Sequence, residues 1–236
     1  MVWEPPQMAA EATETRLIAA MLDGSFAIDS HLPPERVLAA QLGVTRPTLR
    51  EALQRLARDG WLEIRHGLPT RVRDFWREGS LGVLGAISRL PGQLPPQFIP
   101  NLLEVRLTLA PDYTRLAILH APADIVELLS GYGLLEDDPQ SYTQADWDLH
   151  HALTVASRNP VYTMILNGFH DLTFAMGPIY FILPYTRAHS RAFYEGLLGA
   201  ADMGDAAAAE AITRQVMTES IDLWRAAAES AAGGSA

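Results

Sequence analysis

Arginine and threonine side chains gather in one short segment of the chain. Arg46 and Arg50 lie four residues apart, and Thr45 and Thr48 accompany them. Residues four apart share one face of an α-helix, so the two guanidinium groups would project from the same side. A guanidinium can donate two hydrogen bonds to guanine in the major groove of DNA, and a threonine hydroxyl suits a phosphate oxygen. These residue types at this spacing predict a DNA-reading helix, with Thr45 placed to cap its N-terminus.

A carboxylate and an imidazole form a second pattern further along the chain. Asp146 and His150 are also four residues apart, so one helical face would carry both, as in half of a divalent metal site. Two ligands alone are a weak match to a metal motif, and the chain has no cysteine to add a thiolate. We therefore expect no bound metal, with Asp146 and His150 as the weak candidates if one were present.

Motifs that would indicate an enzyme are missing from the sequence. It contains no glycine-rich phosphate loop, no Gly-x-Ser-x-Gly elbow and no His-Glu-x-x-His pair. His150 and His151 beside Asp146 and Asp148 are the only cluster suited to acid–base chemistry, and ordinary solvent-exposed polar side chains would give the same pattern. We expect a protein that binds ligands and catalyses no reaction.

The distribution of charge separates two parts of the chain. The net charge is −10, yet residues 35–73 hold eight arginines and four acids, whereas residues 79–236 hold eight arginines and seventeen acids. A basic segment beside an acidic remainder indicates a nucleic-acid module joined to a domain with another task. All basic residues are arginine, whose planar fork can contact phosphates and bases through paired hydrogen bonds.

Composition and the N-terminus indicate a soluble protein. The 236 residues are 48% hydrophobic and include no cysteine, which excludes a disulfide framework and fits a reducing compartment. No basic region followed by an apolar run begins the chain, and no stretch approaches the roughly 20 apolar residues that cross a bilayer. We expect a cytoplasmic location.

Helical and strand periodicities predict a winged helix-turn-helix over residues 1–74. One helix is expected over residues 9–23, a second from Leu32 to Gly43, and a third from Thr45 to Gly60. Alternating segments at 61–65 and 70–73 predict a β-hairpin wing. Arg36, at the start of the second helix, is placed to reach the DNA backbone. His66 and Gly67, at the wing tip, are placed to enter the minor groove.

The remainder of the chain shows helical periodicity and no strand signal. Residues 75–80 are expected to form a linker, residues 81–230 an all-α ligand-binding domain, and residues 231–236 a disordered tail. The fold class predicted is therefore mostly α. The helices expected in the second domain cover residues 81–90, 98–110, 113–120, 123–135, 142–156, 161–177, 187–203 and 206–228.

The segment Leu32–Trp76, which reads LPPERVLAAQLGVTRPTLREALQRLARDGWLEIRHGLPTRVRDFW, resembles the GntR family of bacterial regulators and, within it, the FadR subfamily. The resemblance continues in NLLEVR (Asn101–Arg106), ASRNPVY (Ala156–Tyr162) and ILNG (Ile165–Gly168), and covers nearly the whole chain. It implies DNA contacts by seven residues: Arg36, Thr45, Arg46, Thr48, Arg50, His66 and Gly67. Pro47 replaces a frequent threonine, and Leu68 replaces a familiar basic residue of the wing.

The same resemblance implies long-chain acyl-CoA as the effector. The residues implied to surround it are Arg106, Tyr180, Tyr194, Met217, Ser220 and Trp224. Arg106 would meet a phosphate or the pantetheine, Tyr194 and Ser220 would supply hydrogen bonds, and Trp224 would wall the pocket. Met217 stands where the subfamily has a glycine, and Glu229 lies near the position of a lysine. These two departures leave open a different preferred acyl length or a weaker affinity for CoA than in the subfamily.

The resemblance also implies an assembly and a mechanism. A homodimer would bind a pseudo-palindromic operator, and acyl-CoA would lower its affinity for DNA. The expected targets are fatty-acid degradation genes, repressed, together with activation of unsaturated fatty-acid synthesis. The alternative is an organic-acid sensor of the sister branch, which uses a metal and two later histidines. His170 and His189 are the candidates for these, but the closing helix has no histidine.

Overall fold

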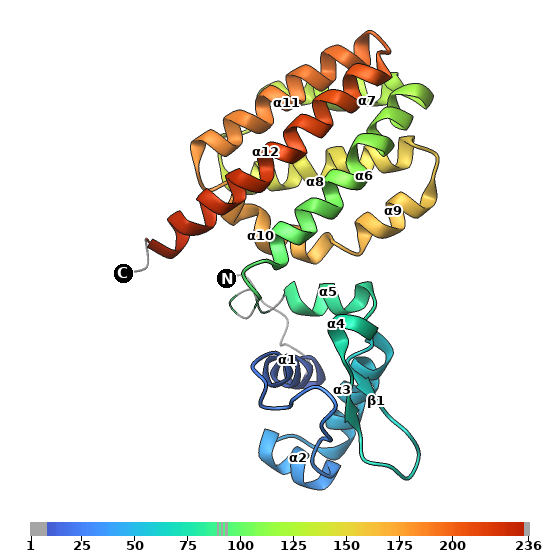
Figure 1. Ribbon diagram of the computed structural model, residues 1–236, viewed down its shortest axis with the longest axis vertical. Helices are drawn as coiled ribbons and strands as arrows, with labels where there is room; N and C mark the ends of the chain where they lie inside the picture. The colour runs from blue at the N-terminus through green and yellow to red at the C-terminus, as the bar shows by residue number, and fades with distance from the viewer. Residues whose placement is uncertain (1–8, 89, 91, 93, 234–236) are drawn as a thin grey trace, which may run out of the picture. The chain divides into compact units, whose positions relative to one another are not determined.

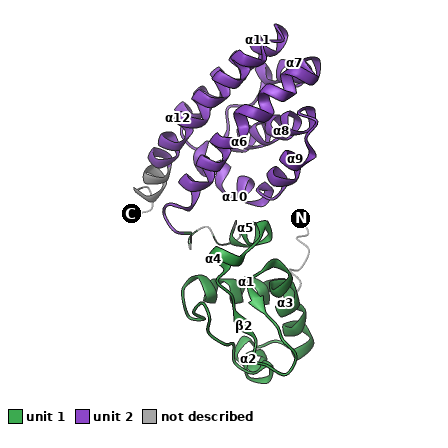
Figure 2. Ribbon diagram, turned by 45° about the vertical axis from the view of Figure 1, so that its right-hand side comes forward, with its two compact units in different colours: residues 1–94 green, residues 95–236 purple. Residues whose placement is uncertain are grey.

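The computed structural model describes residues 9–88, 90, 92 and 94–233. The chain divides into two compact units, Met1–Leu94 and Pro95–Ala236, which are coloured separately in Figure 2. The division by contacts thus falls after the linker expected at residues 75–80. None of the described helices is long and apolar enough to span a membrane.

The first unit contains the winged helix-turn-helix that the sequence predicts. Its elements, visible in the lower part of Figure 1, follow the expected order of three helices and a hairpin, with two further helices after them. Their bounds are α1 Ala9–Leu22, α2 Glu35–Leu42, α3 Arg46–Asp59, β1 Leu62–Glu63, β2 Arg71–Val72, α4 Phe75–Glu78 and α5 Leu81–Ser88.

Both ends of α3 are set by local sequence. The Thr45 hydroxyl accepts a hydrogen bond from the backbone N–H of Thr48 at 3.3 Å, as the predicted N-terminal cap requires. At the other end Gly60 has φ of 100°, a left-handed conformation in which its N–H satisfies a carbonyl of the last turn. The apolar face of α3, which includes Leu49 and Leu56, is buried and packs against α1. This packing holds the opposite, polar face towards solvent.

The wing is a shorter hairpin than expected. Leu62 pairs with Val72 and Glu63 pairs with Arg71 in an antiparallel ladder of two residues a strand. Pro69 has no N–H to give to a ladder, which limits its extension towards the tip. An isolated bridge between His31 and Arg71 ties the base of the wing to the segment before α2.

The predicted linker contains a helix. Residues Phe75–Glu78 form α4, and the Asp74 side chain accepts a hydrogen bond from the Arg77 N–H at 3.3 Å as its cap. Phe75 is buried, with its ring centroid 4.6 Å from that of Trp61. Burial of this aromatic ring therefore anchors the segment to the first unit. The linker was predicted from the polarity of the sequence, which does not reveal such a contact.

The second unit is a bundle of helices, as expected. Within its described residues the chain forms α6 Phe98–His120, α7 Pro122–Ser130, the 3₁₀ turn η2 Gly131–Leu134, α8 Pro139–Ala156, α9 Pro160–Asn167, α10 His170–Tyr180, α11 Pro184–Asp202 and α12 Ala206–Gly233. The long helices α6 and α12 lie side by side, and α11 packs along α12 (Figure 1).

Besides shifts of a few residues at other helix ends, this bundle differs from the sequence-based expectation in three places. The helices expected at 98–110 and 113–120 form one helix, α6, because buried Pro111 is accommodated inside it at the cost of one backbone hydrogen bond. The helix expected at 161–177 divides near Gly168 into α9 and α10. The closing helix α12 continues to Gly233, into the expected tail, because alanine favours helix. Residues 234–236 lie outside the described part of the chain.

Gly177 of α10 marks a close approach to α8. A Cβ at this position would lie 2.6 Å from Cγ2 and 2.7 Å from Oγ1 of Thr143. We expect Gly177→Ala to destabilise the protein by about 1–3 kcal/mol through overpacking, seen as a lower melting temperature. Gly199→Ala in α11 is the matched control, because nothing lies within 4 Å of its added Cβ. Equal melting temperatures for the two variants would contradict this close packing.

Candidate functional site

The exposed start of α3 presents the residues predicted to read DNA. The side chains of Arg46 and Arg50 are 56% and 59% exposed, and Thr45 is also exposed. The hydroxyls of Thr45 and Thr48 are 2.8 Å apart. The structure thus brings these four residues together on the free face of one helix, where a major groove can receive it.

A carboxylate from the neighbouring helix lies between the two arginines. Glu35, the first residue of α2, accepts a hydrogen bond from Arg50 Nε at 2.7 Å and lies 3.7 Å from Arg46. Glu35 was not predicted from the sequence to belong to this interface. Its position in the first turn of a helix and its proximity to Arg36 in sequence were the available signals.

The remaining residues predicted to contact DNA are exposed, on two other elements. Arg36 is the second residue of α2 and makes no ion pair with the residues that the structure describes. His66 and Gly67 lie at the wing tip, where Gly67 has φ of 75° and so adopts a conformation that favours glycine. Leu68 beside them is 61% exposed. The structure is compatible with three separate DNA contacts, from α2, α3 and the wing.

We expect Glu35→Gln to raise affinity for random-sequence DNA by about twofold to fivefold, the size of an exposed ion pair. The carboxylate competes with phosphates for Arg46 and Arg50, so its neutralisation frees both side chains. Glu51→Gln is the control, because Glu51 pairs with Arg55 on the same helix at 2.7 Å. Fluorescence anisotropy on a random duplex measures the change. The same shift in both variants would show that only net charge matters.

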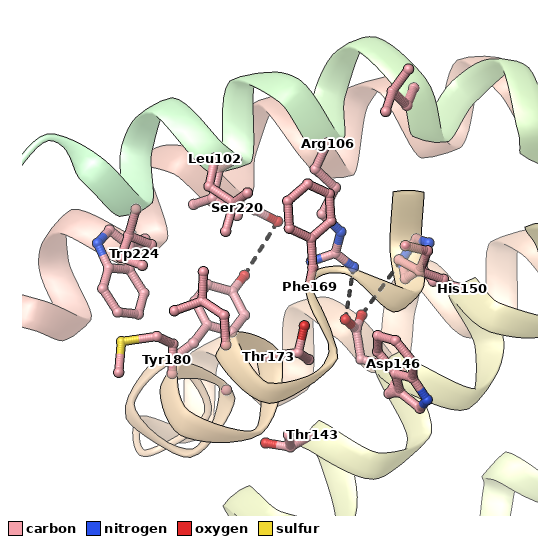
Figure 3. Close-up of a pocket in the computed structure, with 18 of the residues that line it drawn as sticks. Leu102, Arg106, Thr143, Asp146, His150, Phe169, Thr173, Tyr180, Ser220 and Trp224 are labelled. Carbon is pink, nitrogen blue, oxygen red and sulfur yellow. Dashed lines mark hydrogen bonds and ion pairs between the residues drawn. The ribbon is translucent and has the colours of Figure 1, made fainter. Parts of the chain in front are cut away.

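A cavity of about 130 Å³ lies between five helices of the second unit, α6, α8, α9, α10 and α12. Its lining residues are mostly aliphatic and aromatic, and Figure 3 shows most of them. The apolar members are Ile99, Leu102, Leu103, Leu109, Trp147, Ile165, Leu166, Phe169, Leu172, Met176, Phe181 and Trp224. Such a wall with few polar groups suits an apolar ligand that has one polar end.

Four residues of the predicted effector site line this cavity, although they are distant in sequence. Arg106 comes from α6, Tyr180 from α10, and Ser220 and Trp224 from α12 (Figure 3). The Tyr180 hydroxyl donates to Ser220 Oγ at 3.3 Å, and Ser220 Oγ donates to the Val216 carbonyl at 2.8 Å. Burial raises the pKa of Tyr180 to about 12, so its hydroxyl keeps its proton and stays a donor.

Two other predicted residues lie in the packed core and do not line the cavity. Tyr194 is 3% exposed and packs its ring 5.1 Å from that of Tyr132, and Met217 belongs to the same core cluster. The Tyr194 hydroxyl is buried and has no hydrogen-bond partner within the described residues. The side chain of Glu229 lies outside the described part of the chain.

One end of the cavity carries a cluster of polar groups, of which Tyr113 and His150 are buried and Arg106 and Asp146 are partly buried. Arg106 Nη2 donates to Asp146 Oδ2 at 2.7 Å, and the Tyr113 hydroxyl lies 2.7 Å from His150 Nδ1. Burial lowers the pKa of Arg106 while the Asp146 carboxylate raises it, and the net direction is upward, so the guanidinium stays charged. Burial, assisted by Arg106, lowers the pKa of His150 to about 3, so the imidazole is neutral at neutral pH.

The weak metal candidates therefore occupy the cavity wall. Asp146 pairs with a guanidinium, and no group of three histidine, aspartate, glutamate or cysteine side chains with metal-binding geometry occurs among the residues that could be searched. Sequence spacing placed Asp146 and His150 on one helical face correctly. It could not show Arg106 opposite them, because that contact joins residues 40 positions apart.

Comparison with known proteins shows the family. Residues 9–72 match the bacterial regulatory proteins of the gntR family, and residues 73–232 match the FadR C-terminal domain. The chain therefore belongs to the GntR family and carries the FadR type of second domain. It is a DNA-binding transcriptional regulator, as the sequence predicts.

Curated relatives are similar over most of their length. The fatty acid metabolism regulator protein of Shewanella frigidimarina is 39% identical over 216 residues, which cover 92% of this chain and 90% of the relative. The protein of the same name from Yersinia pestis is 41% identical over 191 residues, which cover 81% of this chain and 80% of the relative. The solved structure of Lar, which controls expression of the Listeria monocytogenes agr system, aligns with a TM-score of 0.51. Lar is 18% identical to this protein, and the alignment covers 94% of this chain and 99% of the Lar chain. At this identity the similarity shows a shared fold and nothing about function.

Proposed function

We propose that this protein regulates transcription of fatty-acid metabolism genes and leaves its operator when long-chain acyl-CoA binds the second unit. The observation that carries the proposal is the apolar cavity, which gathers Arg106, Tyr180, Ser220 and Trp224 from three helices. The family and the names of the curated relatives support the same conclusion.

On the DNA side, Arg46 and Arg50 read guanines while Thr45, Thr48 and Arg36 contact the backbone. The proposed assembly is a cytoplasmic homodimer, because a two-fold protein reads a pseudo-palindromic operator with one recognition helix per half-site. The proposed targets are degradation genes, which the protein represses, and genes of unsaturated fatty-acid synthesis, which it activates.

On the ligand side, the acyl chain fills the apolar cavity and the polar part of the ligand lies near Arg106, Tyr180 and Ser220. Because Asp146 already balances the charge of Arg106, this guanidinium suits the pantetheine better than a phosphate. Acyl-CoA binding lowers operator affinity, and linkage requires DNA to weaken acyl-CoA binding by the same factor.

The metal-dependent organic-acid sensor is not favoured. Arg106 holds the carboxylate that such a metal would need, and the apolar wall offers little to a small acid. The chain's similarity to fatty acid metabolism regulators points the same way.

Calorimetric titration of the DNA-free protein with saturated acyl-CoAs of increasing length tests whether the cavity binds the acyl chain of the ligand. Each buried methylene is expected to add about 0.8 kcal/mol of binding free energy until the cavity is full. Free CoA serves as the control for the head group and is expected to bind weakly. An affinity that does not change with acyl length would contradict an acyl-binding cavity.

A further inference from the structure

We propose that Asp146 and His150 determine which acyl compounds the cavity accepts: they admit an uncharged carbonyl, as in a thioester or ester, and exclude a carboxylate. This inference rests on the proposed acyl ligand of the same cavity. It assigns a selective role to two residues whose sequence pattern indicated only a weak metal-site or acid–base candidate.

The charges at this end of the cavity are balanced. Arg106 and Asp146 form an ion pair at 2.7 Å, and their side chains are only 28% and 14% exposed. With neutral His150 beside them, the net charge of this end of the cavity is zero. A carboxylate entering here would add an uncompensated negative charge close to Asp146, where little water can solvate it. An uncharged carbonyl carries no such penalty.

The imidazole of His150 offers a ring nitrogen that has no hydrogen-bond partner in the described part of the chain. His150 is 2% exposed, and its Nε2 has no hydrogen-bond partner within the described residues. The imidazole and the Asp146 carboxylate point toward one another (Figure 3). Nε2 lies 3.7 Å from Asp146 Oδ1, which is beyond hydrogen-bond distance. The nearby carboxylate favours the tautomer with its proton on Nε2, and the Tyr113 hydroxyl then donates to Nδ1.

Together these two features define one polar receptor. A buried N–H without an acceptor is unfavourable, and a carbonyl oxygen from a ligand would satisfy it. The carbonyl of a thioester supplies that oxygen without charge. The remainder of the wall is apolar and accepts the chain that follows the carbonyl.

Asp146→Asn tests the proposal by a gain of binding. In this variant Arg106 is unbalanced, so palmitate is expected to bind about tenfold more tightly or better than it binds wild type. Palmitoyl-CoA affinity is expected to change much less. Quenching of tryptophan fluorescence reports binding, because Trp147 and Trp224 line the cavity. Asp148→Asn is the matched control, because Asp148 is exposed on the same helix and the substitution removes the same negative charge. It is expected to leave palmitate binding at the wild-type level.

A comparison of ligands on the wild-type protein needs no variant and keeps the test decisive if Asp146→Asn does not fold. Methyl palmitate, which keeps the carbonyl and lacks the charge, is expected to bind at least about tenfold more tightly than palmitate. Wild type that binds palmitoyl-CoA but prefers palmitate to its methyl ester would overturn this inference and leave the proposed function standing. So would a folded Asp146→Asn variant without any gain in palmitate affinity. Wild type that binds no acyl compound would instead refute the proposed function.

Discussion

Arg46→Ala and Arg50→Ala are each expected to weaken operator binding by about 1–3 kcal/mol, and the double substitution is expected to abolish specific binding. Both guanidinium groups project from the exposed start of α3, where each can donate two hydrogen bonds to a guanine. Removing one arginine removes those bonds and leaves the acceptors of the base unpaired. The fold is expected to persist, because neither side chain is buried.

A mobility-shift titration measures this effect on an operator selected from random-sequence DNA by the wild-type protein. Arg58→Ala is the matched control, because Arg58 lies near the end of the same helix and is 74% exposed. It removes the same charge at a distance from the reading face. Operator affinity that is unchanged in both single variants, or lowered equally by all three substitutions, would contradict the assignment of Arg46 and Arg50 as base readers.

Thr173→Trp is expected to remove most of the response to acyl-CoA while operator binding persists. Thr173 lines the cavity from α10 (Figure 3). An indole in its place would occupy the volume that we propose the acyl chain fills. Excluding about three methylenes would cost about 2.4 kcal/mol of ligand binding, or about 50-fold in affinity. The variant is expected to remain on its operator at acyl-CoA concentrations that release wild type.

The measurement is the concentration of palmitoyl-CoA that releases half of the bound operator. Thr108→Trp is the control, because Thr108 is exposed on α6 and does not line the cavity. It is expected to behave like wild type. If Thr173→Trp responds to palmitoyl-CoA at the wild-type concentration, the effector binds elsewhere.

The first unit was predictable because its determinants are local. Thr45 as a cap, the apolar face of α3 and Gly60 at its end all lie within one short segment, and the structure confirms them. The sequence did not reveal the helix in residues 75–80, where burial of Phe75 against Trp61 decides the conformation. Polarity along the sequence does not report that contact.

The cavity was less predictable because it depends on contacts between distant residues. Helical periodicity places an apolar side chain in the interior, but it does not distinguish packed core from cavity wall. Tyr194 and Met217 accordingly lie in the core, whereas Tyr180 and Trp224 line the cavity. Pro111 was expected to end a helix, but the packing of α6 along α12 favours a continuous helix through it. Similarity to a family supplied four of the cavity residues, and only the fold supplied Asp146 and His150 as their neighbours.

Release of the operator by acyl-CoAs of increasing length tests whether a ligand in the cavity controls DNA binding, because both sites enter the same measurement. Fluorescence anisotropy of a labelled operator follows release, with free CoA and free fatty acid as controls. We expect long-chain acyl-CoA to release the protein at much lower concentrations than short-chain acyl-CoA, and we expect neither control to release it. Release that is independent of acyl length, or equally effective with free fatty acid, would refute acyl-CoA as the ligand that controls DNA binding.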